Sequence, residues 1–304
     1  MRFVILLSLI GALAACDERT ATSAEGNGPT ATNAASCGLT TDRIGSFASI
    51  PSGSFIKGRN AVYPEEKLGL RLHVVGFDIQ THEVTNAQFA AFVDATNYET
   101  TAERDIAAGR TGAGSAVFER IVDGSMTGNP WRLIPGATWQ KPNGPDSSIE
   151  GLDNHPVVHV SLADAQAYAK WAGARLPTEE EWEFAASSGL PDQNVTTSGA
   201  YDEAGKPRAN TWQGVFPFFD QAEDGFSGAS PVGCFQADQN GVYDMIGNVW
   251  ELTDTPYADG TQTIKGGSYL CADNFCRRYR PEARQPSEVD FSTNHIGFRV
   301  VRDE

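Results

Sequence analysis

The feature of this sequence that most constrains its fold is a long region, residues 187–263, in which apolar residues recur only over short segments. Glycine, proline, aspartate and asparagine are frequent there, and these residues favour turns over long helices and strands. So much irregular chain is uncommon in a compact domain unless something else holds it in place. Bound metal ions are one such support. The region therefore predicts a domain with little regular secondary structure, with metal sites as candidate supports.

Regular elements are expected only in short segments outside this region. Capping boxes at Thr85, Ser161 and Thr178 each precede apolar residues at helical spacing and predict three short helices. Gly173 supplies a stop for the second of these helices. Runs of β-branched and aromatic residues predict strands at 72–77, 157–160 and 298–301.

The N-terminus has the pattern of an export signal. Arg2 provides a positive charge, and residues 3–13 form an apolar run shorter than the roughly 20 residues that a membrane span needs. The following Leu-Ala-Ala-Cys predicts lipoprotein processing with Cys16 as the lipidated first residue, and ordinary secretion is the alternative. We therefore expect a signal peptide at 1–15, a lipidated flexible tether at 16–46 and a folded domain at 47–304. The protein would be exported, on the periplasmic or cell-surface side, and held at the membrane only through Cys16.

The chain is strongly acidic. Its formal net charge of −16 repels phosphate backbones and argues against a nucleic-acid partner. An acidic surface suits hard cations or a basic peptide, and the same charge also serves solubility. The charge therefore narrows the choice of partners without identifying one.

Four cysteines remain after Cys16, and an exported compartment permits disulfides between them. Two of them, Cys37 and Cys234, match no motif. They either pair with each other or leave Cys37 as a free thiol in the tether. The sequence leaves both alternatives open.

The other two cysteines carry the strongest chemical signal. Cys271 and Cys276 lie in the sequence Gly-Gly-Ser-Tyr-Leu-Cys-Ala-Asp-Asn-Phe-Cys-Arg-Arg-Tyr-Arg, which spans 266–280. Two thiolates make a soft site of low coordination number, which favours Cu(I) over zinc, magnesium or calcium. The three arginines that follow favour thiolate over thiol. A small disulfide loop is the structural alternative.

This segment resembles the active-site stretch of the formylglycine-generating enzymes, the sulfatase-modifying factor family. Further family motifs follow in the family's order: Ile-Pro-Ser-Gly-Ser-Phe at 50–55, Glu-Val-Thr-Asn at 83–86, His-Pro-Val-Val-His-Val-Ser at 155–161, Arg-Leu-Pro-Thr-Glu-Glu-Glu-Trp-Glu at 175–183, Gly-Asn-Val-Trp-Glu at 247–251 and Gly-Phe-Arg at 297–299. The resemblance covers nearly everything from residue 47 to the C-terminus. It implies one compact mixed α/β domain, an α+β fold related to C-type lectins.

The resemblance also implies an activity. Cys271 and Cys276 would bind Cu(I), and a substrate cysteine would complete a three-sulfur site at which dioxygen reacts. Ser268 and Trp250 correspond to residues that line the oxygen pocket, although a turn hydroxyl and a packed core side chain are the structural alternatives. The partners would be a sulfatase or another exported protein with a Cys-x-Pro-x-Arg segment, dioxygen and an external reductant. The product would be formylglycine, and the protein would act as a monomer.

Two structural calcium sites follow from the same resemblance. The first would use the side chains of Asn210 and Asp224 with the carbonyls of Thr211 and Phe226. The second would use four positions further along the chain: Asp244, Gly247, Val249 and Glu251. Calcium takes six to eight oxygen ligands, often carboxylates mixed with carbonyls, so the ligand types fit. The alternative is a pair of Asx-type turns with solvated carboxylates.

Histidines offer no comparable site. His155 and His159 are four residues apart, and in the expected strand they would be separated by roughly 13 Å, too far to share one metal. They are expected to pack or to form hydrogen bonds. His295 stands where the family often has asparagine near the substrate cleft.

Two rival functions are weighed against the oxidase. A binding or scaffold lipoprotein with the same fold would have no reason to keep both Cys271 and Cys276. Another oxidation, such as iron-dependent formation of a sulfur–carbon bond, would need a histidine cluster, which the spacing of His155 and His159 argues against.

Overall fold

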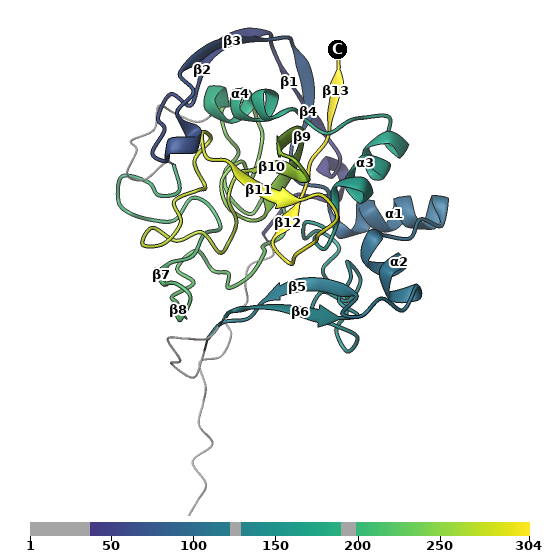
Figure 1. Cartoon of the computed structure of the whole chain (residues 1–304). Helices are drawn as coiled ribbons and strands as arrows, with labels where there is room; N and C mark the ends of the chain where they lie inside the picture. Colours follow the sequence, from purple (N-terminus) through teal and green to yellow (C-terminus); the bar gives the residue numbers. More distant parts are fainter. Residues whose placement is uncertain (1–36, 122–128, 190–198) are drawn as a thin grey trace, which may run out of the picture. The chain divides into compact units, whose positions relative to one another are not determined.

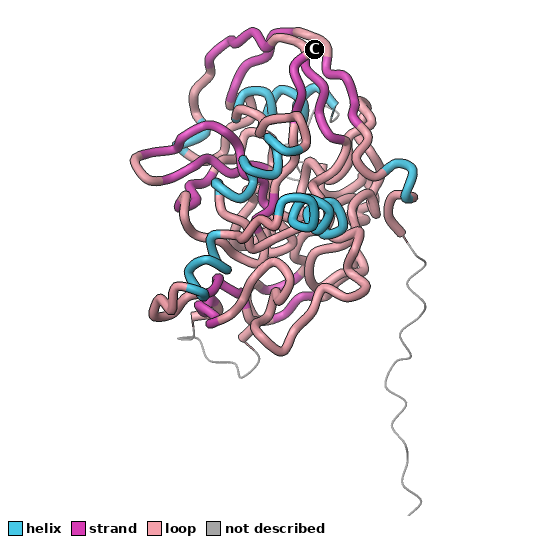
Figure 2. The backbone as a smooth tube through the Cα atoms, turned by 90° about the vertical axis from the view of Figure 1, so that its right-hand side faces the viewer, coloured by secondary structure: helices cyan, strands magenta, loops and turns pink. Residues whose placement is uncertain are grey.

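A computed structural model describes residues 37–121, 129–189 and 199–304. The expected signal peptide, the lipidated Cys16 and most of the expected tether therefore lie outside the described residues. Loops make up most of the described chain, and the helices and strands are short (Figure 2). In the described ranges, no helix has both the length and the hydropathy that a membrane span requires.

The described residues contain four α-helices: α1 (Asn86–Thr96), α2 (Thr101–Ala107), α3 (Leu162–Trp171) and α4 (Glu179–Gly189). The three predicted helices, α1, α3 and α4, are confirmed with their predicted caps. For α4, the backbone N–H of Glu181 donates to Thr178 Oγ1 (3.2 Å) and the N–H of Thr178 donates to Glu181 Oε2 (2.8 Å). The sequence analysis missed α2, although Thr100 and Glu103 form the same kind of capping box.

The strands form two main sheets and three hairpin-like pairs. One sheet has the order β1 (Phe47–Ile50), β4 (Phe77–Gln80), β13 (Val301–Asp303), and the other has the order β11 (Gln285–Glu288), β10 (Thr261–Lys265), β9 (Trp250–Ala258), β12 (Ile296–Gly297). Pairing is antiparallel except between β12 and β9. The pairs are β2 (Gly53–Lys57) with β3 (Leu70–Val74), β5 (Gly114–Phe118) with β6 (Trp131–Pro135), and β7 (Gly214–Val215) with β8 (Phe219–Asp220). Two short 3-10 helices, η1 (Thr41–Arg43) and η2 (Pro64–Glu66), complete the list.

Of the three strand predictions, one is wrong and two are only partly right. The run 72–77 covers the end of β3 and the start of β4. The run 157–160 is not a strand, because its backbone bonds go to two separate segments, at Val84 and Thr293, and His159 takes a left-handed conformation (φ 60°). In the run 298–301 only Val301 lies in a strand, and the carbonyls of Phe298 and Val300 accept hydrogen bonds outside any ladder.

The buried core explains how so little regular structure holds together. Phe89 of α1 lies at the centre of the largest cluster, with ring centroids 5.1 Å from Trp139, 5.9 Å from Tyr168 and 6.4 Å from Phe298. Helices α1, α2 and α3 lie together on one side, whereas α4 packs against β9 and β10 (Figure 1). Large aromatic side chains from loops thus bury the area that longer elements would otherwise supply.

The sequence left open whether Cys37 pairs with Cys234. Cys37 and Cys234 form a disulfide. Beside it, Leu39 is buried and its N–H donates to the carbonyl of Val232 (3.0 Å). Residues 37–46, which the sequence analysis placed in the tether, therefore lie against the domain.

Candidate functional site

The predicted thiol pair lies directly after β10, in a tightly folded loop. Gly266 and Gly267 have left-handed φ angles of 91° and 74°. A Cβ atom on Gly267 would lie 2.7 Å from Tyr279 Cα, so only glycine lets the start of the loop approach its end this closely. The backbone N–H of Cys271 donates to the carbonyl of Ser268, and that of Cys276 donates to the carbonyl of Ala272. These turns bring the two cysteines together.

The two sulfurs face each other. Cys271 Sγ and Cys276 Sγ are 3.7 Å apart, and neither cysteine is in a disulfide. Cys271 is 2% exposed, whereas Cys276 is half-buried and follows Phe275, which is 67% exposed. The pair is therefore reduced, convergent and open on the Cys276 side.

The two thiols differ in acidity. The hydrogen bond from the Cys271 thiol lowers the pKa of Cys276 to about 7, aided by the backbone N–H and the charge of Arg278. The shared hydrogen bond and burial hold the pKa of Cys271 well above its ordinary value. Cys276 is thus the thiolate of the pair near neutral pH.

Acidic residues from η2 anchor the arginines behind Cys276. Arg278 forms an ion pair with Glu65, and its guanidinium lies 4.2 Å from the centroid of the Tyr63 ring. Arg280 is buried and forms two hydrogen bonds to Glu66, of 2.6 and 2.7 Å. The sequence indicates that these arginines favour a thiolate, but it does not show that Glu65 and Glu66 bind them. More than two hundred residues separate each pair along the chain.

Ser268 and Trp250 both lie in the interior. Ser268 is fully buried, and its Oγ accepts a hydrogen bond from the N–H of Leu270 (3.2 Å) within the cysteine loop. Trp250, at the start of β9, is 2% exposed and belongs to the same buried cluster as Cys271. Its backbone N–H donates to the carbonyl of His295 (2.9 Å).

A row of aromatic rings that the sequence analysis did not identify leads away from the cysteine loop. Phe275 stacks on Phe216 (4.5 Å between centroids), and Phe216 contacts Trp212 and Phe118. Phe118 contacts Trp131, which lies 4.7 Å from the ring of His295. Trp131 and His295 line a hollow of about 470 Å³ together with residues of β11, including Glu288.

The histidines behave as predicted. His159 is buried and bonds Ser115 Oγ through Nδ1 (2.6 Å) and the carbonyl of Pro142 through Nε2 (2.8 Å). His155 is separate from it, and burial lowers the pKa values of both. Burial also lowers the pKa of His295, to about 3.

The first candidate calcium site has an unsatisfied oxygen. Asn210 Oδ1 is buried without a hydrogen-bond partner among the described residues. Asp224 accepts hydrogen bonds from the N–H groups of Thr211 (3.0 Å), the residue after Asn210, and of Phe226 (2.9 Å). Gln213, which was not predicted, donates to Asp224 Oδ2 (2.9 Å). An oxygen with no donor next to a carboxylate fits a hard cation.

The second candidate calcium site is also rich in buried oxygen. Asp244 is 8% exposed, has a left-handed φ of 56° and accepts a hydrogen bond from the N–H of Gly233 (2.7 Å). Glu251 is fully buried and bound by Arg299 and by the indole N–H of Trp182. Burial raises the pKa of Asp244 to about 6. Gly247 and Val249 lie between these two carboxylates in the chain.

Carboxylates alone do not complete either site. Across the described ranges, no group of three or more His, Cys, Asp or Glu side chains is arranged to hold a metal. A cation at these places would therefore rely on amide and carbonyl oxygens as well.

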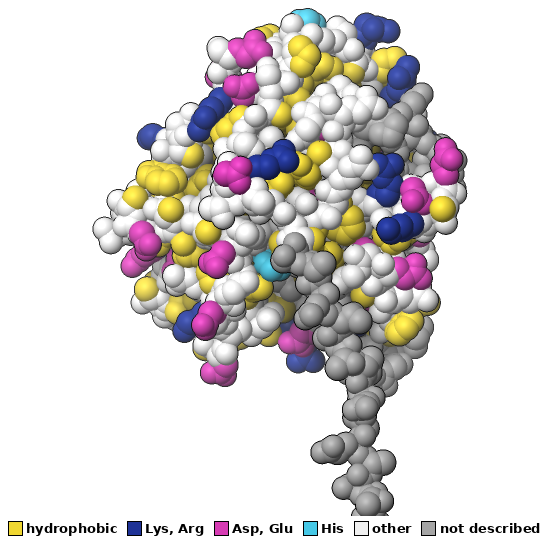
Figure 3. All heavy atoms as spheres, turned by 180° about the vertical axis from the view of Figure 1, so that it is seen from behind, with side chains coloured by type: hydrophobic (Ala, Val, Ile, Leu, Met, Phe, Trp, Pro, Cys, Tyr) yellow, Lys and Arg dark blue, Asp and Glu magenta, His cyan; other side chains and the backbone are white. Residues whose placement is uncertain are grey.

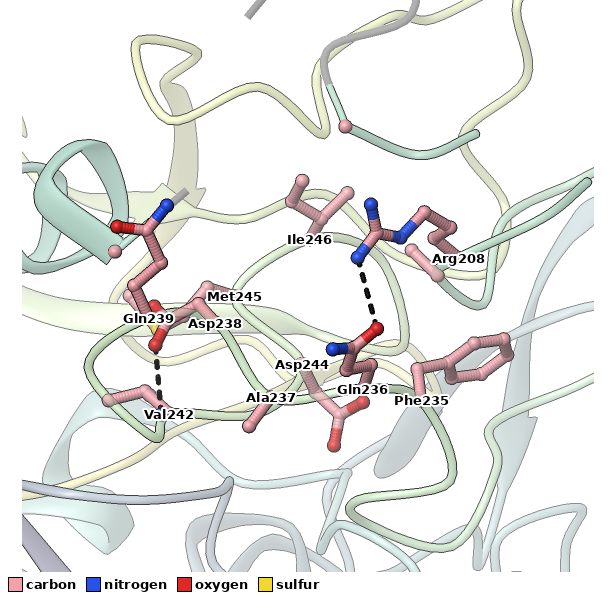
Figure 4. A pocket seen from close by; sticks show the side chains of 13 residues that line it. Arg208, Phe235, Gln236, Ala237, Asp238, Gln239, Val242, Asp244, Met245 and Ile246 are labelled. Carbon is pink, nitrogen blue, oxygen red and sulfur yellow. Dashed lines mark hydrogen bonds between the residues drawn. The ribbon is translucent and has the colours of Figure 1, made fainter. Parts of the chain in front are cut away.

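Asp244 also lines a hollow of about 340 Å³ with Arg208, Gln236 and Asp238 (Figure 4). On the surface, acidic and basic side chains are interspersed over the face shown in Figure 3.

The fold and the site define the class of this protein: a mixed α/β domain of short elements that carries a convergent pair of free thiols. Comparison with known proteins gives its family. Residues 36–304 match the model of the sulfatase-modifying factor enzyme 1-like domain. The chain belongs to this family, which includes the formylglycine-generating enzymes. The compact mixed α/β fold predicted from the sequence is thereby confirmed.

Individual relatives agree with this assignment. The chain is 43% identical over 295 residues to the formylglycine-generating enzyme of Mycobacterium tuberculosis, covering 84% of this chain and 96% of the relative. It is also 39% identical over 268 residues to the inactive Cα-formylglycine-generating enzyme 2 of Mus musculus, covering 83% of this chain and 84% of that one. The solved structure of PvdO from Pseudomonas aeruginosa aligns with a TM-score of 0.57 at 21% identity, over 85% of this chain and 94% of that chain, which bears on the fold alone.

Proposed function

We propose that this protein oxidises a cysteine of a sulfatase, or of another exported protein, to Cα-formylglycine. The change takes an R–CH₂–SH side chain, one O₂ and two reducing equivalents with their protons to R–CHO, hydrogen sulfide and water. The carbon–sulfur bond breaks, a carbon–oxygen double bond forms, and an external thiol or similar reductant supplies the two electrons. The observation that supports this most strongly is the pair of unbonded sulfurs 3.7 Å apart at the surface end of a buried loop.

The thiol pair fits Cu(I) as the cofactor. Metal–thiolate bonds of about 2.3 Å allow two sulfurs as far as about 4.6 Å apart to share one metal, and the 3.7 Å separation of Cys271 and Cys276 meets this condition. Thiolates select soft ions such as Cu(I), whereas structural zinc takes four ligands. Bound copper would supply one-electron chemistry with dioxygen.

Each residue of the pair has a separate part in the proposal. Cys276 is available as a thiolate near neutral pH and is the more exposed of the two, so a substrate thiol would approach from its side. Cys271 is buried and would give up its proton when the metal binds. Ser268 would order the cysteine loop through its hydrogen bond with the N–H of Leu270. Trp250 would line the oxygen pocket on the side of the protein interior.

Aromatic residues around the site would exclude water from the reaction. Phe275, Phe216 and Trp212 pack beside the cysteine loop, and a dry site protects reactive intermediates from side reactions. We assign the substrate segment to the hollow of about 470 Å³ beside Trp131 and His295. Its lining mixes apolar side chains with polar and charged ones, Arg132 among them, which suits an extended peptide, and Glu288 in its wall suits a basic side chain.

A scaffold protein without chemistry is the second candidate function. The relatives make it a necessary alternative, since chains of nearly equal identity to this one are named as active and as inactive. Two reduced, convergent thiols with one acidified by its neighbour favour the oxidase. Iron-dependent chemistry is less well supported, because His159 is bonded to Ser115 and Pro142, and the described residues contain no group of three or more His, Cys, Asp or Glu side chains arranged to hold a metal.

Calcium and a lipid anchor complete the proposal. Two Ca²⁺ ions would hold the irregular region, one at Asn210, Thr211, Asp224 and Phe226, and one at Asp244, Gly247, Val249 and Glu251. The unpartnered Asn210 Oδ1 supports the first site. The protein would be exported and attached to the membrane through a lipid on Cys16.

An aldehyde assay tests the proposed activity. Copper-loaded protein, oxygen and reductant are incubated with a Cys-x-Pro-x-Arg peptide, and aldehyde is trapped as an oxime and quantified by mass spectrometry. We expect product with the native protein and none with Cys271→Ser or Cys276→Ser. As a matched control, the double variant Cys37→Ser/Cys234→Ser keeps the thiol pair and retains activity per folded molecule. Full activity in both single variants would refute the assignment of the pair.

A further inference from the structure

Glu179, the first residue of α4, is a buried carboxylate that no part of the proposed function uses. It contacts three cations that come from separate segments of the chain: Lys57 Nζ is 3.0 Å from its Oε2, Lys265 Nζ is 3.8 Å from its Oε1, and Arg284 Nε is 2.8 Å from its Oε1. Arg284 also donates from Nη2 to Glu179 Oε2 (3.0 Å). A carboxylate that is only 1% exposed is expensive to bury unless it is paired, and these contacts pair it.

Two of the three cations lie at the ends of the cysteine loop, which connects β10 to β11. Ladder pairing between these strands ends with Ile264 opposite Gln285. One step further along this register, the opposed positions are Lys265 and Arg284. Like charges directly opposite each other on neighbouring strands are destabilising. Glu179 contacts both cations and offsets their repulsion at the base of the loop.

Each end of the loop leads to one of the two sulfurs. The glycine turn follows Lys265 directly and continues to Cys271. At the other end, the carbonyl of Arg284 accepts a hydrogen bond from Arg278 Nη1 (3.1 Å), and Arg278 is two residues beyond Cys276. A change in the separation of the two ends would therefore move the cysteines relative to each other.

We propose that Glu179 is a positioning residue for the thiol pair. By contacting Lys265 and Arg284 together, it holds the ends of the cysteine loop at the separation at which Cys271 and Cys276 converge. The inference rests on the part of the proposed function that assigns the chemistry to these two cysteines. It adds a residue that acts on them through the base of their loop.

Neighbouring carboxylates pair with two of the cations. Lys57 forms an ion pair with Glu180, and Lys265 donates to Glu183 (3.0 Å). Glutamine at 179 would leave these two pairs in place. It would remove the carboxylate that contacts the cations at both ends of the loop, so its effect isolates that contact.

Dithiol capture by the copper-free protein tests the inference. Phenylarsine oxide bonds both sulfurs of a close thiol pair, so its affinity reports their convergence without copper, and Cu(I) affinity is measured in parallel by competition with a chelator. We expect Glu179→Gln to bind both probes more weakly per folded molecule, by about tenfold or more, the usual cost of removing a group that orients metal ligands. Native affinity of E179Q for phenylarsine oxide would overturn the positioning role.

Two double variants of equal net charge separate positioning from charge balance. Glu179→Gln/Arg284→Gln removes one of the opposed cations and should recover much of the affinity for phenylarsine oxide that E179Q loses. Glu179→Gln/Lys57→Gln has the same net charge but leaves Lys265 and Arg284 opposed, so its affinity should stay low. Equal affinity in the two double variants, whether high or low, would overturn the inference. If E179Q does not fold, the two double variants and the native protein carry the comparison.

Glu181→Gln is the matched control on the same helix. Glu181 binds Arg175 through two hydrogen bonds of 2.7 Å and accepts from the N–H of Thr178 at the start of α4. Its substitution should lower stability and leave the affinity for both probes at the native level, whereas a loss equal to that of E179Q would contradict the specific role of Glu179. A native protein that captures phenylarsine oxide but not Cu(I) would contradict the copper assignment, and the phenylarsine oxide comparison would still decide the role of Glu179.

Discussion

Cys276 differs from Cys271 in both exposure and charge environment, and this difference is the chemical basis of the site. The hydrogen bond from Cys271 and the nearby Arg278 lower the pKa of Cys276 to about 7. The sequence predicted the pair of thiols and the basic residues after them. It could not predict which thiol ionises first, since that depends on the direction of the hydrogen bond between the thiols and on the nearby Arg278, which Glu65 and Tyr63 contact from a distant segment.

Alkylation of the apo-protein measures this asymmetry. With limiting iodoacetamide, the rate at Cys276 should rise with pH around a midpoint near 7, because the thiolate is the nucleophile and its pKa is lowered to about 7. Cys271 should stay unmodified in the folded protein. Arg278→Gln should raise the midpoint and slow alkylation at pH 7, by about fivefold if the pKa rises by one unit, because the thiolate fraction then falls from about one half to about one tenth.

Arg277→Gln is the matched control for this experiment. Arg277 precedes Arg278 directly, and its side chain donates to the carbonyl of Asp273 (3.1 Å). Its substitution should move the midpoint less than that of Arg278. Equal reactivity of Cys271 and Cys276 across the pH range would contradict the asymmetry.

At the scale of elements, the sequence predicted the helices whose ends are set by hydrogen bonds between residues close together in the chain. Thr85, Ser161 and Thr178 fixed the helices because a capping box needs only residues a single turn apart. The run 157–160 has strand-like composition, but Val157 and His159 bond to two different segments, so no ladder forms. The β-propensity of a residue reflects how well its side chain packs against neighbouring strands, and the sequence alone does not show which segments those are.

The close approach of the Gly266-Gly267 turn to Tyr279 leads to a testable prediction. Gly267→Ala should lower the free energy of unfolding by about 2–4 kcal/mol, since it adds left-handed strain and a clash with the Tyr279 backbone. It should also weaken copper binding, because the turn places Cys271. Urea unfolding and Cu(I) titration measure the two effects.

Gly260→Ala is the control, because Gly260 has almost the same φ (73° against 74°) but open space where its Cβ would stand. Its substitution should cost only about 1 kcal/mol, the strain alone. Copper affinity should not change. Equal losses of stability in the two variants would show that the close approach to Tyr279 is not a constraint.

At the scale of the whole molecule, the compact mixed α/β fold was predictable because family motifs run through the domain in order. Contacts outside the motifs were not. The disulfide of Cys37 with Cys234 joins residues 197 positions apart, and no motif marks either of them. Glu83 lies within a family motif, yet the hydrogen bond that Asn248 donates to it across 165 positions of the chain appears only in the folded structure.

The Cys37–Cys234 disulfide should contribute to global stability. Closing so long a loop restricts the unfolded chain, and removing such a bond typically costs about 2–4 kcal/mol. The double variant Cys37→Ser/Cys234→Ser should therefore unfold at lower urea concentration with native copper affinity. Unchanged stability would indicate that residues 37–46 add nothing to the domain.

Copper-edge X-ray absorption tests the central claim most directly, because it counts the sulfur ligands at the metal. The Cu(I)-loaded protein should show two sulfurs, from Cys271 and Cys276, and a third when a Cys-x-Pro-x-Arg peptide is added. The same peptide with serine in place of cysteine should leave the count at two. A shell dominated by nitrogen or oxygen, or a sulfur count that the cysteine peptide does not change, would contradict the account.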